Sequence, residues 1–239
     1  MTIVEQLIAK WTAFESALKY AFHDYDKKDV ESFLKAHHIT DIDVQQMNTI
    51  RNIRNAIAHP CSTKDGKPFF VLNEDVISVL DEAMHIVATL PKVANVEVPF
   101  EKVQICRLND NVKDVVSEMI EQSHSNVPVL NDQNHVIGVL SESVMLRLGL
   151  DILSARRPTK IRDIMEYLRF GKNVRRPDEF HFVCDNDPIV SLYRKCRDAT
   201  MRNKRTEMFF VTKDGERKRE LKGIVTIWDF VRLIESGDE

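Results

Sequence analysis

The sequence contains no hydrophobic run long enough to cross a lipid bilayer. A membrane-spanning helix needs about 20 apolar residues, whereas the longest apolar stretches, such as 75–90, are broken by Asp or Glu every few residues. The N-terminus also lacks the apolar segment of a secretory signal, because Glu5 and Lys10 interrupt it. We therefore expect a cytoplasmic protein that makes no membrane contact.

Cysteine is scarce, and no two cysteines form a C-x-x-C pair. The four are Cys61, Cys106, Cys184 and Cys196. A chain of 239 residues can bury enough apolar surface to fold without disulfides. The histidines are scattered as well, so no His, Cys or Asp cluster has the spacing of metal ligands. We expect reduced cysteines that mostly pack, and no structural metal.

An excess of charge of one sign is also missing from the chain as a whole, whose net charge is −3. The charge is nevertheless unevenly distributed. Residues 1–95 carry 10 basic and 13 acidic groups, residues 96–155 carry 4 and 9, and residues 156–239 carry 20 and 15. An anionic ligand or a polyanion is therefore attracted mainly to the last third.

Residues 1–92 have the pattern of a small helical domain. Apolar residues recur at helical spacing from Val4 to Phe22. Further helices are predicted over 30–37, 41–58 and 73–90, with Asp41 and Asn73 as N-caps. Pro91 ends the last helix, and an extended linker over 95–99 marks a domain boundary. The sequence thus predicts a four-helix bundle.

After residue 100 the pattern changes to short β-branched runs that alternate with helical stretches, and this alternation occurs twice. The first copy predicts strands at 103–106, 127–130 and 136–140 and helices at 112–122 and 141–148. The second predicts strands at 182–184, 208–211 and 221–225 and helices at 189–197 and 226–234. The predicted fold class is therefore α+β, with two β-α-β-β-α units.

The two copies can be aligned residue by residue over one segment. Val136–Val144 aligns with Leu221–Asp229, which pairs Gly138 with Gly223 and Ser141 with Thr226. A β-α-β-β-α repeat that ends in Gly-Ile-Val-Thr-x-x-Asp resembles the CBS domain, and Ile161–Met165 resembles the lead-in that usually opens a CBS unit. The resemblance covers about residues 100–235 and suggests units at 100–155 and 156–239.

The CBS resemblance implies that the two units pack as a pair, with a cleft that commonly holds an adenine nucleotide such as ATP, ADP or AMP. By this resemblance, Thr226 and the helix that follows it would bind a phosphate, and Asp229 would accept both ribose hydroxyls. The first copy keeps Ser141 but has Val144 in place of the aspartate. We therefore expect one competent site and one weak or empty site.

Other readings of these residues stay open. Thr226 and Ser141 are also good helix N-caps, and many CBS pairs serve only as packing surfaces. Arg156, Arg157 and the basic run from 194 to 205 can contact phosphates, or can be a solvated face.

The segment Ile50–Pro60 contains Arg54 and Asn55, with His59 four residues after the asparagine. This arrangement in a small helical domain resembles the HEPN family, whose active members cleave RNA without a metal at a site formed by two copies. The resemblance implies a catalytic set of Arg54, Asn55 and His59 that needs no cofactor. In such a set His59 acts as acid or base and Arg54 holds the phosphate.

A structural reading of the same segment is that Arg54 pairs on the bundle surface and His59 binds the last carbonyls of its helix. Two functions follow. The first is a homodimeric ribonuclease that an adenine nucleotide regulates through the CBS pair. The alternative is a non-catalytic nucleotide sensor whose helical domain recruits a partner. In a third, weaker reading the basic last third binds nucleic acid directly.

Overall fold

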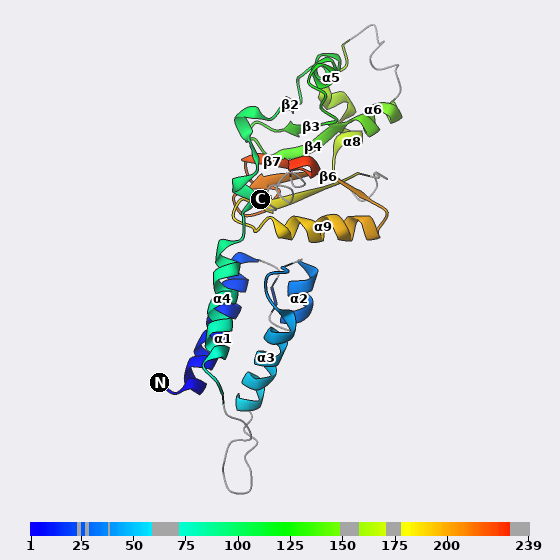
Figure 1. Cartoon of the computed structure of the whole chain (residues 1–239). Coiled ribbons are helices and arrows are strands. Elements are labelled where there is room, and N and C mark those ends of the chain that lie inside the picture. Colours follow the sequence, from blue (N-terminus) through cyan, green and yellow to red (C-terminus); the bar gives the residue numbers. More distant parts are fainter. Residues whose placement is uncertain are drawn as a thin grey trace, which may run out of the picture. The chain divides into compact units, whose positions relative to one another are not determined.

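A computed structural model describes residues 1–22, 25–26, 29–37, 39–58, 72–148, 158–170 and 178–229. The chain divides into two compact units (Figure 1). Unit 1 comprises Met1–Lys92 together with Asp187–Arg194, and unit 2 comprises Val93–Asn186 together with Lys195–Glu239. No helix among the described residues is both long enough and apolar enough to span a bilayer.

Unit 1 contains the four helices that the periodicity predicts. They are α1 (Ile3–Ala21), α2 (Val30–Ala36), α3 (Val44–Ala58) and α4 (Asp75–Thr89). Helix α1 begins with a capping box, in which the Thr2 hydroxyl accepts from the backbone of Glu5 and the Glu5 carboxylate accepts from the backbone of Thr2. Helix α1 lies along α4 within the unit.

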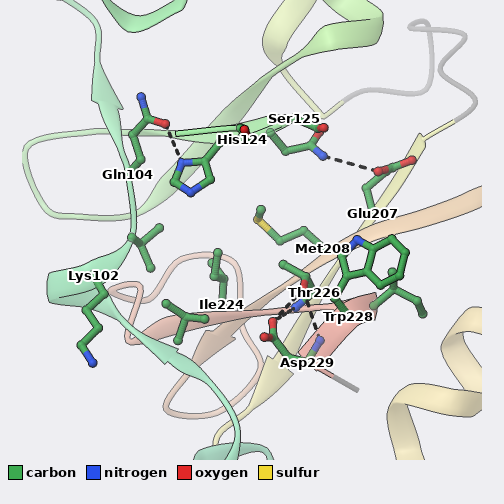
Figure 2. Close-up of a pocket in the computed structure, with 15 residues that line it drawn as sticks. Lys102, Gln104, His124, Ser125, Glu207, Met208, Ile224, Thr226, Trp228 and Asp229 are labelled. Carbon is green, nitrogen blue, oxygen red and sulfur yellow. Dashed lines mark hydrogen bonds between the residues drawn. The ribbon is translucent and has the colours of Figure 1, made fainter. Parts of the chain in front are cut away.

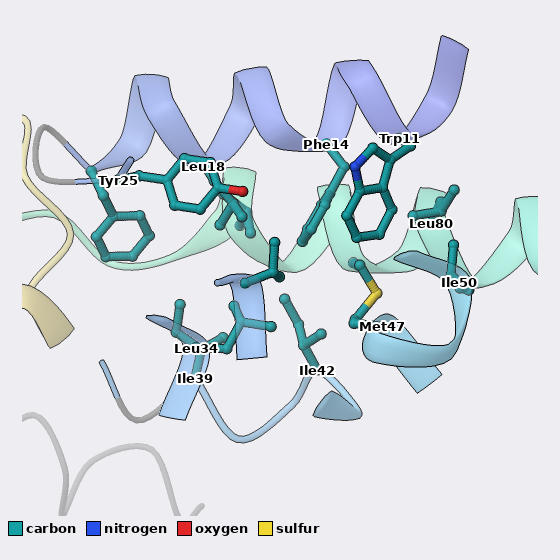
Figure 3. Close-up of a cluster of buried hydrophobic side chains, with 14 of the residues drawn as sticks. Trp11, Phe14, Leu18, Tyr25, Leu34, Ile39, Ile42, Met47, Ile50 and Leu80 are labelled. Carbon is teal, nitrogen blue, oxygen red and sulfur yellow. The ribbon is translucent and has the colours of Figure 1, made fainter. Parts of the chain in front are cut away.

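A single apolar core holds these helices together (Figure 3). Trp11, Phe14 and Leu18 come from one face of α1, which is the face that the 3.6-residue spacing selects. The other elements contribute Leu34, Ile39, Ile42, Met47, Ile50 and Leu80. The core therefore draws on α1, α2, α3 and α4.

Two predicted helix caps were wrong. Helix α3 begins at Val44, and the carboxylate that accepts from its first free N–H groups belongs to Asp43, not to Asp41. At the start of α4 the Asn73 side chain donates to the Asp75 carboxylate at 2.6 Å, so it caps no backbone group. At α3 a second aspartate two positions further along takes the cap, and at α4 the N-cap position is Glu74, whose side chain makes no capping hydrogen bond.

Unit 2 contains two small sheets. The strands are β1 (Val98–Pro99), β2 (Cys106–Arg107), β3 (Asn126–Leu130), β4 (Val136–Ser141), β5 (Asp178–Cys184), β6 (Arg205–Thr212) and β7 (Gly223–Thr226). One sheet has the order β2-β3-β4 and the other β1-β7-β6-β5. In each, the first strand of the repeat runs parallel to the second, and the second and third are antiparallel. This is the predicted mixed α+β fold.

The helices of the repeat follow the same plan. Helix α5 (Val112–Glu121) joins β2 to β3, and α9 (Val190–Met201) joins β5 to β6. Helix α6 (Glu142–Leu148) follows β4, and helical residues begin again at Ile227 after β7. Short helical segments are η1 (Val93–Asn95), η2 (Phe100–Lys102), η3 (Ile161–Ile164) and α8 (Met165–Leu168).

The first predicted strand is shorter than expected. Only Cys106 of the predicted strand 103–106 is part of β2, and Val103 instead follows the 3₁₀ turn η2, with its N–H donating to the Phe100 carbonyl at 3.1 Å. The side chains of Val103 and Ile105 still pack against the apolar residues between the two sheets. Their burial, and not strand pairing, accounts for the β-branched run.

The aligned glycines Gly138 and Gly223 mark close approaches between backbones. A Cβ atom at Gly223 would lie 2.4 Å from the Val98 carbonyl oxygen, and one at Gly138 would lie 2.8 Å from the Leu168 carbonyl oxygen. Both distances are shorter than any real Cβ contact, so only glycine fits. In each copy a segment that precedes a repeat therefore crosses the third strand of the other repeat.

This crossing exchanges the two lead-in segments between the repeats. Strand β1, which precedes the first repeat, pairs with β7 of the second. Residues 158–168, which precede the second repeat, pack into the core of the first: the Thr159 carbonyl accepts from the N–H of Val112, and Ile161 and Leu168 are buried there. The predicted boundary between residues 155 and 156 follows the sequence repeat. In the packing, however, each lead-in segment belongs with the other repeat.

Candidate functional site in unit 2

A cavity of about 400 Å³ opens in unit 2 where the two repeats meet (Figure 2). It is lined by Val98, Lys102, Val103, Gln104, Ser123, His124, Ser125, Asn126, Glu207, Met208, Ile224, Thr226, Ile227, Trp228 and Asp229. Its size falls within the range of about 300–1,000 Å³ that is typical of small-molecule sites.

Thr226 and Asp229 lie together at one wall of this cavity. The Asp229 carboxylate accepts from the Thr226 backbone N–H at 2.8 Å and from the Thr226 hydroxyl at 2.7 Å. The Asp229 N–H points back to the Thr226 hydroxyl oxygen at 3.5 Å. This is the geometry of a capping box at the end of β7, where the chain turns from strand into helix. Both side chains are half-buried.

The inner surface of the cavity is apolar. Val98 comes from β1, Val103 follows η2, Met208 comes from β6 and Ile224 comes from β7. These four side chains also belong to the apolar cluster between the two sheets. Such a surface offers dispersion contacts to a flat, weakly polar group, while the polar residues surround it.

A hydrogen-bonded pair forms the opposite wall. The Gln104 amide nitrogen donates to the Val115 carbonyl at 3.5 Å, which turns the Gln104 amide oxygen toward His124. The His124 Nδ1 lies 2.9 Å from that oxygen and therefore carries the proton in this pair. Ser123 adopts a left-handed conformation with φ 58°, which turns the chain after α5 so that His124 faces the cavity.

The remaining polar lining is of mixed charge. The Glu207 carboxylate lies 3.4 Å from the Asn126 amide nitrogen and 3.4 Å from the Arg205 guanidinium. Lys102 lies on the side of the cavity that faces away from Trp228 in Figure 2. The described lining therefore offers an ammonium group, two carboxylates and several neutral donors and acceptors.

The structure places the other residues that the sequence suggested for ligand binding as follows. Ser141, the counterpart of Thr226, is 2% exposed, and its hydroxyl oxygen accepts weakly from the Val144 N–H at 3.4 Å, at the start of α6. Ser141 is not among the lining residues of the cavity. Arg156 and Arg157 lie outside the described residues.

Several members of the basic run between 194 and 205 form ion pairs. Arg202 donates to both oxygens of Glu179 at 3.0 Å, and Arg197 lies 3.4 Å from Asp198. A second basic group surrounds the β6–β7 connection, where Lys222 pairs with Asp185 and Arg219 donates to Asp214 at 2.7 Å. Ion pairing already uses much of this charge.

The counterpart of the cavity residue Val103 in the other repeat is an aromatic residue. Val129 and Val211 pair with the aligned glycines, and their parallel partners are Cys106 and Val183. Counting back three residues from Cys106 and from Val183 makes Val103 the counterpart of Phe180. Phe180, Phe182, Phe170 and Phe210 pack with ring centroids 5.2–6.0 Å apart.

The two repeats therefore differ in bulk at this position, because a phenylalanine occupies space that valine leaves free. They differ also at the aspartate: the counterpart of Asp229 is Val144, which is buried in the core of the first repeat.

In unit 1, two of the three residues of the predicted catalytic set lie side by side near the end of α3. The Arg54 guanidinium donates to the Asn55 side-chain oxygen at 3.0 Å. Arg54 is half-buried and Asn55 is exposed. His59 lies outside the described residues.

Sequence reasoning identified Thr226 and Asp229 but not the rest of the lining. Gln104, His124 and Glu207 lie in segments that carry no motif. Trp228 carried a signal that was overlooked: the repeat alignment places this large aromatic residue opposite Ser143. Within the described part of the chain, no three His, Cys, Asp or Glu side chains form a group that could hold a metal.

Comparison with known proteins identifies part of this unit. Residues 94–151 match the family model of the CBS domain. No curated protein matches the chain.

The chain is similar to several solved structures of CBS domains, at low sequence identity. CBSX2 in complex with AMP is 16% identical with a TM-score of 0.46, covering 62% of this chain and 99% of that one. CBSX2 from Arabidopsis thaliana is 18% identical with a TM-score of 0.45, covering 63% and 98%. The CBS domain pair of protein MJ0100, in complex with 5′-methylthioadenosine and S-adenosyl-L-methionine, is 14% identical with a TM-score of 0.43, covering 62% and 98%. Residues 94–151 thus match the CBS domain model, and the solved structures to which the chain is similar include a CBS-pair protein and a CBS domain pair.

Proposed function

We propose that unit 2 binds an adenine nucleotide in the cavity beside Thr226 and Asp229, and that the chain acts as a nucleotide sensor. The observation that carries this proposal is the position of the Thr226–Asp229 pair at the wall of a cavity with an apolar inner surface. A carboxylate can accept two hydrogen bonds from the vicinal hydroxyls of a ribose. The apolar surface then suits the base.

Calorimetric titration of the full chain with AMP, ADP and ATP tests this proposal. We expect saturable binding with one site per chain, and a large loss of affinity in Asp229→Ala. Val144→Ala is the matched control, because Val144 is the counterpart of Asp229 in the other repeat and lies outside the cavity lining. Absence of binding for all three nucleotides would overturn the proposal.

A second candidate function concerns unit 1. We propose that Arg54 and Asn55 form, together with His59, a metal-independent site for RNA cleavage that is completed by a second copy of the chain. The contact between Arg54 and Asn55 favours it, since it holds a guanidinium at the end of α3 where it can bind a phosphate. The nucleotide in unit 2 would then regulate this activity by binding two states of the protein with different affinity.

Cleavage of a labelled RNA in the presence of a chelator tests this second candidate. The wild type is compared with His59→Ala, Arg54→Ala and Arg51→Ala, each with and without AMP, ADP or ATP. Arg51 lies one turn earlier on the same helix and approaches Asp29 at 4.0 Å, so its variant removes the same charge outside the motif. Cleavage that His59→Ala and Arg54→Ala lose and Arg51→Ala keeps supports the ribonuclease. If all variants keep the cleavage, or if the wild type shows none, the ribonuclease proposal is rejected. The remaining proposal is then a sensor whose helical unit recruits a partner.

A further inference from the structure

Trp228 has an unusual position for a tryptophan. Its side chain is 73% exposed, although tryptophan is among the residues that gain most from burial. It also lines the cavity, and it lies in the chain between Thr226 and Asp229. The other tryptophan, Trp11, is 1% exposed in the core of unit 1 and shows how this side chain packs when it serves stability alone.

The surroundings of Trp228 favour a flat ligand group. In Figure 2 the indole ring stands beside Met208 and Glu207, on the side of the cavity opposite Lys102. The ring is anchored by a backbone that the Thr226–Asp229 hydrogen bonds hold in place. A group that binds Asp229 therefore lies within one residue of a large, exposed aromatic surface.

The repeat supplies an internal comparison. The counterpart of Trp228 in the first repeat is Ser143, whose hydroxyl lies 3.0 Å from that of Ser141, and the counterpart of Asp229 is the buried Val144. The repeat that has lost the carboxylate thus has no aromatic ring at this position. The ring and the carboxylate occur together on the side where the cavity is open.

We propose that Trp228 is the base-stacking and specificity-determining residue of the nucleotide site: a purine ring lies against the indole face while the ribose faces Asp229. This inference rests on the proposed nucleotide binding in unit 2. Stacking of a base on an aromatic side chain is favourable for every base, and it is larger for the two-ring purines because more surface is covered. Trp228 therefore selects AMP over CMP.

Tryptophan fluorescence and calorimetry together test this assignment on the full chain. The chain contains only two tryptophans, and Trp11 is buried in unit 1, so a ligand-induced change in emission reports on Trp228. AMP should quench the wild type and leave Trp228→Phe unchanged. Calorimetry should show about a tenfold or larger loss of AMP affinity in Trp228→Ala, a smaller loss in Trp228→Phe, and a reduced preference for AMP over CMP in Trp228→Ala.

The outcomes separate this inference from the function on which it rests. Binding of AMP to the wild type with no change in emission, and with equal affinity in Trp228→Ala, overturns the stacking role but leaves the nucleotide site intact. Failure of the wild type to bind any of AMP, ADP and ATP overturns both. Circular dichroism and the melting temperature show whether Trp228→Ala folds. If Trp228→Ala does not fold, the comparison of the wild type with Trp228→Phe still tests the stacking role.

Discussion

The Asp229 carboxylate accepts both the backbone N–H and the hydroxyl of Thr226, at 2.8 and 2.7 Å. The same two side chains are the ones proposed to bind phosphate and ribose. A ligand must therefore compete with the capping box for these groups: the Thr226 hydroxyl has to turn its proton from Asp229 toward the phosphate. Ligand binding and the start of the helical turn at Ile227 are thus coupled through Thr226 and Asp229.

Removing the cap at either repeat should separate its structural role from ligand binding. Thr226→Ala and Ser141→Ala each remove the oxygen at the start of a helix, and we expect each to lower the free energy of unfolding by about 1 kcal/mol. Only Thr226→Ala should also lower nucleotide affinity, since Ser141 lies outside the cavity lining. Urea denaturation and calorimetry measure the two effects. An equal loss of affinity in both variants would contradict this assignment.

Substitution of the aligned glycines should be costly. A methyl group at Gly223 would meet the Val98 carbonyl oxygen at 2.4 Å, and β1 would have to move away from β7. We expect Gly223→Ala to lower the free energy of unfolding by about 1–3 kcal/mol, as overpacking does in well-packed interiors.

Gly138→Ala is the matched comparison for this prediction. Its contact with the Leu168 carbonyl oxygen is longer, at 2.8 Å, so the loss should be smaller. Chemical denaturation of both variants gives the order. A Gly223→Ala variant as stable as the wild type would show that β1 does not approach β7 as described.

Truncation of Phe180 should lower the stability of the aromatic cluster in the second repeat. Phe180 contacts Phe170 and Phe210 with centroid distances of 6.0 Å. Because its side chain is partly exposed, we expect Phe180→Ala to cost about 2–3 kcal/mol, below the 3–5 kcal/mol typical of a fully buried phenylalanine. Denaturation measures the loss. A cost near zero would mean that these rings do not pack as a cluster.

His181 should make unit 2 less stable in acid. Burial lowers the pKa of this imidazole below its usual 6.5; nearby Glu179 raises the pKa, and Lys195 and Arg202 lower it further. Below about pH 6.5 the unfolded chain binds a proton that the folded chain excludes, so the free energy of unfolding falls as pH decreases from 7 toward the folded-state pKa.

Denaturation of the wild type and of His181→Gln between pH 7 and pH 5 tests the histidine contribution. The variant lacks the titrating group, so its stability should decline less over this range. The stacking of His181 on Phe209, at 5.5 Å between centroids, is lost as well, which lowers the stability of the variant at every pH but does not change the slope. Parallel pH profiles for the two proteins would contradict the assignment.

The thiol of Cys106 should be unreactive in the folded protein. It is fully buried, and burial raises its pKa to about 12, so the reactive thiolate is scarce at neutral pH. Alkylation followed by mass spectrometry should modify Cys106 only after denaturation. Modification of Cys106 at the rate of an exposed thiol would show that the first repeat opens readily.

Much of the fold could be predicted because its signals are local. The spacing of Trp11, Phe14 and Leu18 shows the buried face of α1, and the alignment of Gly138 with Gly223 shows the repeat. The cap positions at Asp43 and Glu74 could not be distinguished from their neighbours, because several polar residues lie at each helix start. The exchange of lead-in segments depends on contacts between residues far apart in the chain, such as Val98 with Ile224 and Val112 with Thr159.

The site was predictable only where a motif marked it. Thr226 and Asp229 are three residues apart in a recognisable pattern, and both line the cavity. Gln104 precedes α5 in the sequence and His124 follows it, and only the folded chain brings these two residues together at the cavity. Phe180 differs from its counterpart Val103 in the size of its side chain, which no spacing rule detects.

Filling the cavity with a larger side chain tests most directly whether a nucleotide binds there. Val103→Phe introduces the phenylalanine that the other repeat carries at the corresponding position 180, and calorimetry compares the affinity of this variant for AMP, ADP and ATP with that of the wild type. We predict saturable binding to the wild type and none to a Val103→Phe variant with an unchanged circular dichroism spectrum. Equal affinity in the two proteins would contradict this prediction and place any nucleotide elsewhere.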